Sequence, residues 1–225
     1  MSNTKFLYCK YDNLKGFIHH GKYLRFYDIN YYKDLENALI KDDESNKRYF
    51  HTSDNIDLLQ VNEIKINPNI IKGELEISIP TRRSHALCLC NIGKNDTLFE
   101  RFDADLCIEI NVDLLIEILR SYFQNIDEKI EVIGKNVDYF KINEKEMELD
   151  NKKIVFKKNY EDFHVENEYR IAIFYPYDSN TMLKTSDNNY IKVFGGNNYI
   201  EICLTNKSDI KKVIVKSTRK DGILV

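Results

Sequence analysis

Two carboxylates lie close together in the segment Phe163–Phe174, where a run of apolar residues begins. Residues 168–174 read Glu-Tyr-Arg-Ile-Ala-Ile-Phe, and Glu166 precedes Glu168 by two positions. In a strand, residues two apart share one face and lie about 7 Å from each other. A carboxylate at the entrance of an apolar strand is partly removed from water, which raises its pKa or directs its charge at a developing cation. The alternative is that Glu168 simply pairs with Arg170 on an open sheet face.

A second candidate is the aromatic segment Tyr23–Tyr27, which reads Tyr-Leu-Arg-Phe-Tyr. Strand alternation puts Tyr23, Arg25 and Tyr27 on one face and the two apolar residues on the other. A guanidinium between two tyrosines suits the wall of a cleft, where it binds phosphate while the rings stack on a ligand. The alternative is an amphipathic strand whose polar face meets solvent.

A third candidate runs from Arg48 to Asn55, with the sequence Arg-Tyr-Phe-His-Thr-Ser-Asp-Asn. Aromatic strand residues, including Tyr49, lead here into hydroxyl, carboxylate and amide side chains, including Ser53. Such a strand end can present hydrogen-bond donors to a ligand, but the same residues also make an ordinary polar turn.

The elements that must position these residues are short strands and a few helices. The pattern predicts helices over residues 31–40, 111–123 and 158–163, with Asn111 capping the second. Strands are predicted over residues 5–11, 23–27, 48–51, 74–79, 85–91, 104–110, 131–134, 137–142, 153–157, 168–174, 190–193, 199–204 and 212–215. We therefore expect one α+β domain over residues 1–225, with mainly antiparallel sheets and helices concentrated in the N-terminal half. Strand–helix–strand repeats are too few for a doubly wound dinucleotide-binding sheet.

Composition narrows the class of protein. The 225 residues are 43% hydrophobic and 31% charged, with only 3 Pro and 8 Gly, which excludes disordered and collagen-like chains. The net charge of −3 gives no basic excess for nucleic acid or acidic lipid. Because no apolar run approaches the ~20 residues of a membrane span and the start lacks a signal-peptide core, we expect a cytoplasmic protein without a membrane partner.

Motifs for metals and phosphates are missing from the sequence. The chain has no phosphate-binding glycine loop, zinc-protease motif or hydrolase nucleophile elbow. The five cysteines form no CxxC pair, so we interpret them as reduced packing residues, and no metal site is expected. The three segments above are therefore the main candidates for a functional site.

The late segment resembles a widespread bacterial family of domains of unknown function. The shared pattern is Phe-x-Lys, then Tyr-x-x-Phe-x-x-Glu-x-Glu-Tyr-Arg-Ile, read here from Phe156 to Ile171. An early aromatic–Arg strand, a Tyr-Phe-x-x-Ser strand end at residues 49–53 and a Cys-rich strand at 85–91 extend the resemblance to roughly residues 20 to 215. The chain departs from the family at Asp54-Asn55-Ile56-Asp57, where Asn-Asp-Pro is usual, and it lacks the family's Trp.

The same landmarks, in the same order, are similar to those of the ADP-ribosyltransferase fold. Those enzymes carry an Arg or His on an early strand, a Ser or Tyr at a second strand end, and a Glu on a late strand, often as Glu-x-Glu. In this chain the matching residues are Arg25, then Ser53 with Tyr49 nearby, then Glu168 with Glu166 before it. Ser78 competes with Ser53 for the middle position.

This resemblance implies an NAD-dependent mono-ADP-ribosyltransferase that uses NAD as its substrate. Glu168 would stabilise the oxocarbenium-like state formed as the nicotinamide–ribose bond breaks, and Glu166 would orient or deprotonate the acceptor. Arg25 would bind the pyrophosphate or adenosine side. The remaining members of the predicted NAD-binding set are Tyr27, Tyr49, Ser53 and Arg170.

The resemblance also implies a toxin or phage-defence effector that modifies a macromolecule, protein or nucleic acid, with an antitoxin as a further partner. Two alternatives stay open from the sequence. One is a non-catalytic interaction domain in which the Glu168–Arg170 pair is structural. The other is a nucleic-acid-directed defence protein, which the acidic charge balance disfavours.

Overall fold

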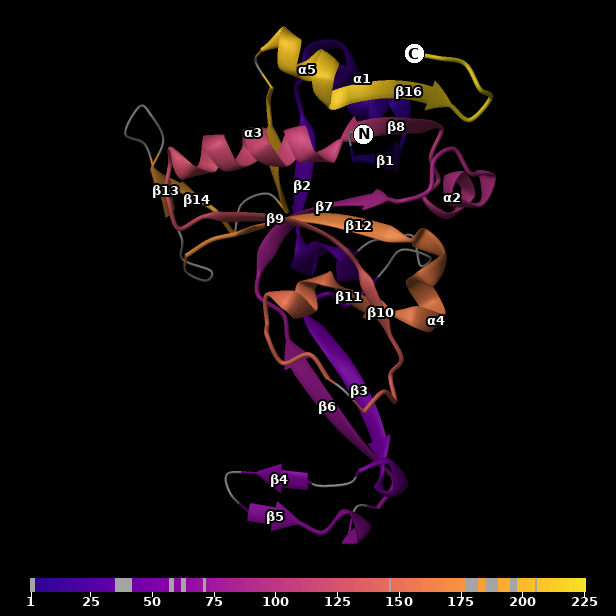
Figure 1. Ribbon diagram of the computed structural model, residues 1–225, viewed down its shortest axis with the longest axis vertical. Coiled ribbons are helices and arrows are strands. Elements are labelled where there is room, and N and C mark those ends of the chain that lie inside the picture. The colour runs from indigo at the N-terminus through magenta and orange to yellow at the C-terminus, as the bar shows by residue number, and fades with distance from the viewer. Residues whose placement is uncertain are drawn as a thin grey trace.

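One large antiparallel sheet organises the molecule (Figure 1). The computed structural model describes residues 3–34, 42–56, 59–61, 64–70, 72–145, 147–176, 182–184, 190–194, 198–204 and 206–225. Within these residues, eight strands form the sheet: β1 (Thr4–Cys9), β2 (Leu24–Asp28), β7 (Ser84–Cys90), β8 (Leu106–Asn111), β9 (Glu131–Asn136), β12 (Glu168–Phe174), β15 (Tyr199–Ile202) and β16 (Ile214–Arg219). All their pairings are antiparallel, which confirms the predicted α+β class with mainly antiparallel sheets.

The strand β7 is the branch point of this sheet. Along one edge it pairs with β12 over its whole length, from Ser84 to Cys90. Its other edge is divided, because β2 pairs with His85 and Ala86 whereas β1 pairs only with Cys90. The strands β1 and β2 therefore separate from each other beside residues 87–89.

Helices α1 (Tyr11–His20), α3 (Val112–Gln124) and α5 (Lys207–Val213) cover one face of the sheet (Figure 1). Their apolar side chains join those of the strands in one core, because helical and strand periodicities each turn one side inward. Core members include Phe17, Leu115, Leu119, Ile108, Ile171, Ile173 and Val213. Packing of these residues fixes β1, β2 and β12 in place around the branch point.

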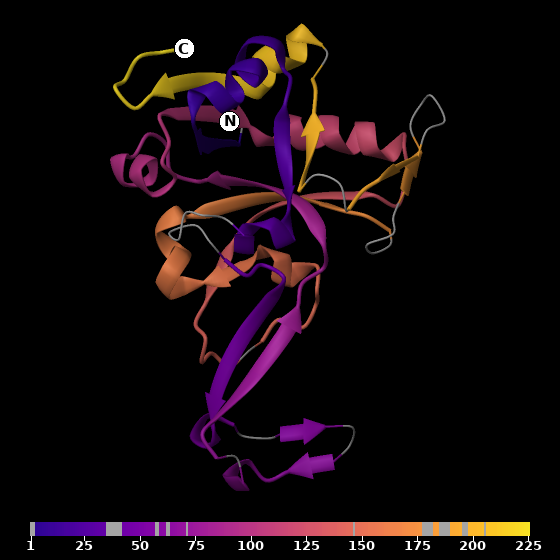
Figure 2. The ribbon, with the colours of Figure 1, turned by 180° about the vertical axis from the view of Figure 1, so that it is seen from behind.

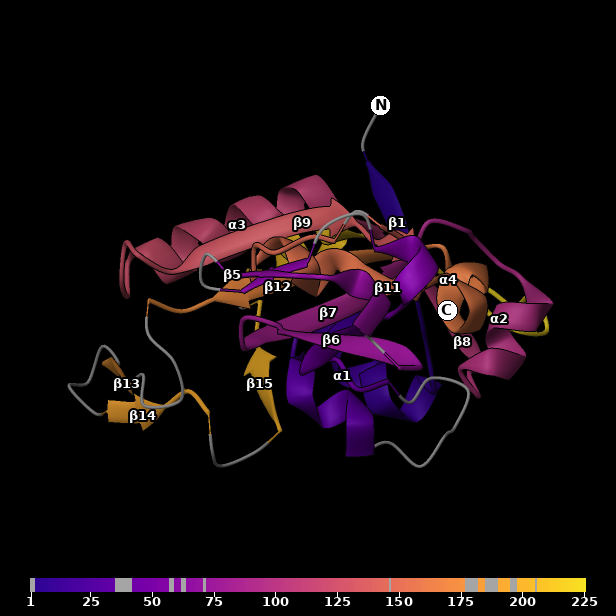
Figure 3. The ribbon, with the colours of Figure 1, turned by 90° about the horizontal axis from the view of Figure 1, so that it is seen from below.

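Two local devices set the position of α3, which runs along β9 (Figure 3). The Asn111 Oδ1 atom accepts a hydrogen bond from the Leu114 backbone N–H at 3.2 Å, which confirms the predicted cap. A Cβ atom at Gly134 of β9 would collide with the side chains of Ile116 and Tyr169. Glycine at this position therefore allows the helix to approach the strand closely.

A second layer lies on the opposite face of the sheet. It contains the 3-10 helix η4 (Lys153–Phe156), the parallel pair β10 (Asp138–Phe140) and β11 (Lys157–Asn159), and the short helix α4 (Tyr160–Phe163). Val155 and Phe156 pack against Ala172 and Phe174 of β12. Because both of its faces are covered, every residue of β12 is buried.

A long hairpin, which we call the arm, projects from this layer (Figures 1 and 2). It consists of β3 (Asn46–Thr52) and β6 (Glu74–Pro80), with the small pair β4 (Leu59–Val61) and β5 (Ile64–Ile66) at its far end. Short 3-10 turns, η2 (Ser53–Asn55) and η3 (Pro68–Ile70), lie between them. At its base, Tyr49 and Ile79 pack against Phe140 and Ile154.

Several predicted elements differ from the structure. Residues 153–157 were expected to be a strand but form η4 and the start of β11, because the Asp150 carboxylate accepts hydrogen bonds from the N–H groups of Lys152 and Lys153 and closes a turn. The predicted strand 212–215 begins inside α5, a C-terminal helix that we had not expected. Residues 29–34 form the 3-10 helix η1 (Ile29–Asp34), and the rest of the predicted helix 31–40 lies outside the described residues.

Helices α1 and α2 (Asp96–Arg101) lie in the N-terminal half, whereas α3, α4 and α5 lie at or beyond the middle of the chain. The predicted concentration of helices in the N-terminal half is therefore not confirmed for the described residues. No helix in the described part of the chain is long and apolar enough to cross a lipid bilayer.

Candidate functional site

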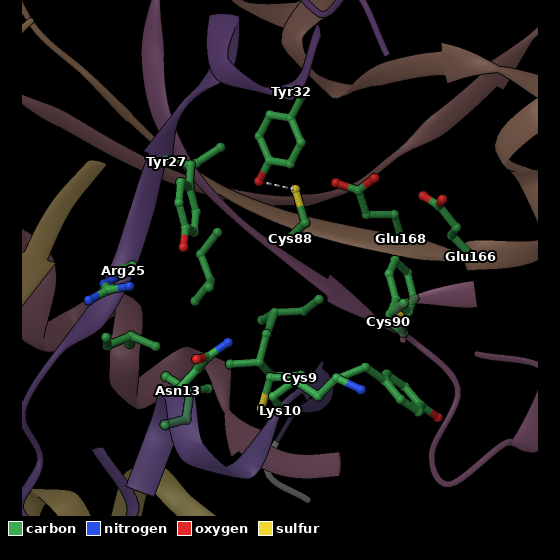
Figure 4. Close-up of a pocket in the computed structure, with 18 of the residues that line it drawn as sticks. Cys9, Lys10, Asn13, Arg25, Tyr27, Tyr32, Cys88, Cys90, Glu166 and Glu168 are labelled. Carbon is green, nitrogen blue, oxygen red and sulfur yellow. Dashed lines mark hydrogen bonds between the residues drawn. The ribbon is translucent and has the colours of Figure 1, made fainter. Parts of the chain in front are cut away.

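A pocket opens where β1 and β2 separate along β7. Its volume is about 370 Å³, which falls within the roughly 300–1,000 Å³ typical of small-molecule sites. Residues 86–90 of β7 line it, together with residues 7–10 around the end of β1 and residues of β2 and η1. Figure 4 shows Arg25 on one side and the carboxylates of Glu166 and Glu168 on the other. The division of the sheet thus creates the pocket and brings two of the three predicted segments to it.

The wall formed by β2 carries Arg25 and Tyr27. The Arg25 Nε–H donates to Glu201 Oε1 at 3.0 Å, and its guanidinium lies 4.5 Å from the centre of the Tyr199 ring. Tyr27 stacks on Tyr31 with ring centres 5.3 Å apart. Partial burial acts to lower the pKa of Arg25, but Glu201 and the Tyr27 hydroxyl raise it above the ordinary value of a guanidinium. The pocket wall therefore combines a permanent cation with a stacked pair of aromatic rings.

On the opposite wall, both carboxylate oxygens of Glu168 lie beside buried cations. Its Oε1 atom accepts a hydrogen bond from Arg170 Nε at 2.7 Å. Its Oε2 atom is buried and lies 3.0 Å from Lys158 Nζ in an ion pair. Glu168 therefore brings a paired negative charge to the pocket wall.

Glu166 is held differently, in the 3-10 turn η5 (His164–Glu166) just before β12. Its Oε1 atom accepts from Arg101 Nε at 2.9 Å, and its Oε2 atom accepts from Lys158 Nζ at 2.9 Å. Both oxygens are engaged by cations and the side chain is only 3% exposed. This geometry does not support the predicted role of Glu166 in deprotonating an acceptor; it makes Glu166 a support for Lys158.

Arg170 lies behind Glu168 rather than in the pocket. Its guanidinium donates to Glu168, to the Val155 carbonyl, and through both Nη atoms to Glu44, at 3.1 and 2.8 Å. Arg170 is 1% exposed and does not line the pocket. The predicted contact with NAD is therefore not supported, and the Glu168–Arg170 pair is buried rather than on an open sheet face.

These residues belong to a larger buried ion network. Glu44 also accepts a hydrogen bond from Lys47 Nζ at 2.6 Å and lies 3.9 Å from Lys158 Nζ. Burial alone would raise the pKa of Glu168, but Arg170 and Lys158 lower it to about 2. Burial also acts to raise the pKa of Glu44, but Arg170 and Lys47 hold it well below its usual range. Glu168 is therefore ionised at neutral pH. The sequence suggested that burial would either raise the pKa of this carboxylate or direct its charge, and the structure contradicts the raised pKa.

The third predicted segment is not part of the pocket. Tyr49 is fully buried at the base of the arm, with its ring 4.8 Å from that of Phe140. Ser53 is the first residue of η2, just after β3 ends. Ser78 is on β6 and lies opposite Arg48 of β3. None of the three lines the pocket. The hairpin carries these residues away from the site, so the structure supports neither serine in the middle position of the three-residue pattern.

The pocket is also lined by polar side chains to which the sequence analysis assigned no role. Lys158 contacts both Glu166 and Glu168, and it is the Lys of the Phe-x-Lys pattern, which was the available signal. The Tyr32 hydroxyl lies 3.2 Å from Cys88 Sγ beside Glu168 (Figure 4). Burial and the Glu168 charge raise the pKa of the Cys88 thiol to about 12, so this cysteine is a neutral neighbour rather than a nucleophile.

The described residues contain no cluster of three or more side chains suited to a metal ion. Comparison of the chain with protein-family models, curated protein sequences and solved structures finds no match. The function must therefore be inferred from the chemistry of the pocket.

Proposed function

We propose that the protein has an ADP-ribosyltransferase-like fold, binds NAD in this pocket and breaks the bond between nicotinamide and ribose. The observation that supports this most is the meeting of Arg25 and Glu168 in one pocket, although they come from strands far apart in the sequence. The divided sheet supports the fold part of the proposal, because it opens a cleft between the strand of Arg25 and the strand of Glu168.

The chemistry of the pocket agrees with cleavage of a glycosidic bond. When the C–N bond breaks, its electron pair leaves with nicotinamide and the ribose carbon becomes cationic. The ionised Glu168 is already in place, and its negative charge lies at the pocket wall beside Arg170 and Lys158. In the ground state the positive charge lies on the nicotinamide ring, and in the transition state it moves to the ribose. A negative charge beside the ribose therefore stabilises the transition state more than the ground state, which accelerates the reaction.

The acceptor captures the ribosyl cation and loses a proton. Because both oxygens of Glu166 are occupied by Arg101 and Lys158, this proton passes to solvent or to the acceptor's own groups. A macromolecular acceptor, a role as a toxin or phage-defence effector, and an antitoxin partner are proposed on the family resemblance alone.

One observation favours a second candidate, a domain that binds a ligand without chemistry. Glu168 and Glu166 are both neutralised by buried cations, as expected of a network that stabilises the fold. In that case the pocket would recognise a nucleotide without cleaving it.

The experiment is to incubate the purified full chain with NAD and quantify nicotinamide by chromatography. We expect nicotinamide release in the wild type and its loss in Arg25→Ala, which is a partly exposed position whose substitution leaves the core intact. Binding of NAD without release would favour the second candidate. Neither binding nor release would refute both.

A further inference from the structure

The strand β15 supplies two residues that act on Arg25 from outside the pocket. In the pairing of β15 with β2, Glu201 lies directly opposite Arg25 and Tyr199 lies opposite Tyr27. The carboxylate and the ring contact the same guanidinium, at 3.0 Å from Nε and 4.5 Å from the ring centre. Arg25 is therefore fixed by a hydrogen bond to Glu201 and by the position of its guanidinium over the face of the Tyr199 ring.

We infer that Glu201 and Tyr199 are positioning residues that orient Arg25 to bind the diphosphate of a dinucleotide. This inference rests on the proposed function, because it specifies which part of NAD the Arg25 wall recognises. Glu201 occupies the Nε–H, so the donors left for a ligand are on the two Nη atoms, beside the Tyr27 hydroxyl. Two parallel N–H groups match two oxygens of a phosphate, whereas a lysine in the same place would act only as a point charge.

The exposure of the pair agrees with a ligand-binding role. The side chains of Arg25 and Glu201 are 38% and 32% exposed, so the pair lies at the surface, with Arg25 lining the pocket and Glu201 outside it. An exposed ion pair contributes little to stability. The pair is therefore better explained by the orientation that it gives to the Arg25 guanidinium than by a contribution to the stability of the fold.

The charge of Glu201 makes this inference testable, because Glu201 has two opposite effects on the affinity for a diphosphate. The hydrogen bond from Arg25 fixes the guanidinium and favours phosphate binding. The negative charge of Glu201 repels a diphosphate nearby and weakens its binding. A variant with a neutral residue at position 201 that keeps the hydrogen bond to Arg25 should therefore bind the diphosphate more tightly than the wild type does.

The test measures binding of ADP-ribose to the full chain by titration calorimetry. We expect Glu201→Gln to bind ADP-ribose about 3- to 10-fold more tightly, and Glu201→Ala to bind it less tightly than Glu201→Gln. Tyr199→Ala should weaken binding about 2- to 5-fold, the scale of an exposed cation–π contact. Arg25→Lys should weaken it at least 10-fold. In cleavage assays the Glu201 variants should change KM for NAD and leave kcat unaltered.

Two controls isolate the effect. Glu131→Gln removes a comparable exposed carboxylate, paired with Lys152 at 2.6 Å on the edge strand β9, and should not alter ADP-ribose binding. Binding of nicotinamide, which has no phosphate, should be the same in all Glu201 variants. Wild-type affinity for ADP-ribose in both Glu201→Gln and Glu201→Ala would overturn the inference, as would a wild-type protein that does not bind ADP-ribose.

The two proposals fail in different ways. If ADP-ribose binds and responds to Glu201 but NAD is not cleaved, the positioning role holds and the enzymatic proposal fails. If NAD is cleaved but ADP-ribose binding ignores Glu201, only the positioning role fails.

Discussion

Replacing Glu168 by glutamine tests stability and chemistry at once. The substitution keeps the size of the side chain but removes the charge that Arg170 and Lys158 contact at 2.7 and 3.0 Å. Breaking a buried ion pair costs about 3–5 kcal/mol. We expect the lower end, about 3 kcal/mol, because Arg170 retains Glu44 and Lys158 retains Glu166. In a chain of this length that corresponds to a fall in Tm of about 6–12 °C.

Activity gives the second measurement. If Glu168 stabilises the ribosyl cation, nicotinamide release should fall about 10²–10³-fold, the usual effect of losing one electrostatic stabiliser. Assays are run well below the melting temperature of the variant, and circular dichroism confirms that it is folded.

Glu44→Gln is the matched control. Glu44 belongs to the same buried network and contacts the same Arg170, but it does not line the pocket. We expect a similar loss of stability with activity within a few-fold of wild type. If the two variants lose activity equally while folded, Glu168 is structural and the catalytic assignment is wrong. If neither is destabilised, our account of the network is wrong.

Two further predictions concern titration and thiol reactivity. Burial, with Arg83 adding to it, lowers the pKa of His85 to about 4, so the folded state binds fewer protons than the unfolded state between pH 4 and 6.5. Stability should therefore rise with pH across this window, by on the order of 3 kcal/mol, and urea unfolding at pH 4.5 and 7 should show a smaller rise in His85→Gln. A thiol reagent should modify Cys203 rapidly, because it is exposed whereas burial raises the thiol pKa of Cys9, Cys88, Cys90 and Cys107. More than one fast thiol, or a fast thiol that persists in Cys203→Ser, would contradict this.

The sequence predicted strands well where the signal is local. The predicted strand 168–174 has the same bounds as β12, and the cap at Asn111 is confirmed, because both depend on neighbouring residues. The alternation of Leu24 and Phe26 with Arg25 and Tyr27 is also confirmed by their burial. In β12 the alternation of polar and apolar residues does not indicate which side chains are exposed, because the layers on both faces of the sheet bury all seven residues.

The candidate site could be predicted only in part. Arg25, Tyr27, Glu166 and Glu168 line the pocket, but the sequence does not show that Glu166 is held by Arg101 and Lys158. Tyr49 and Ser53 were misplaced because chain order does not reveal the direction of a hairpin, and β3 leads away from the sheet. Glu44 and Arg170 interact although 126 residues separate them, and a contact between such distant residues cannot be predicted from local sequence patterns.

The bond between Glu44 and Arg170 also orders events during synthesis of the chain. Glu44 is made 126 residues before Arg170, which donates two hydrogen bonds to it, an interval of about 6–25 s at roughly 5–20 residues per second. Over most of that interval Lys47 is the only cation of the final network that is available to it, and the polar groups that Arg170 satisfies must stay hydrated. The base of the arm therefore cannot reach its final packing on the sheet until β12 has left the ribosome. The carboxylate wall of the pocket forms at the same step, so a nascent chain that has not reached Arg170 has no complete site.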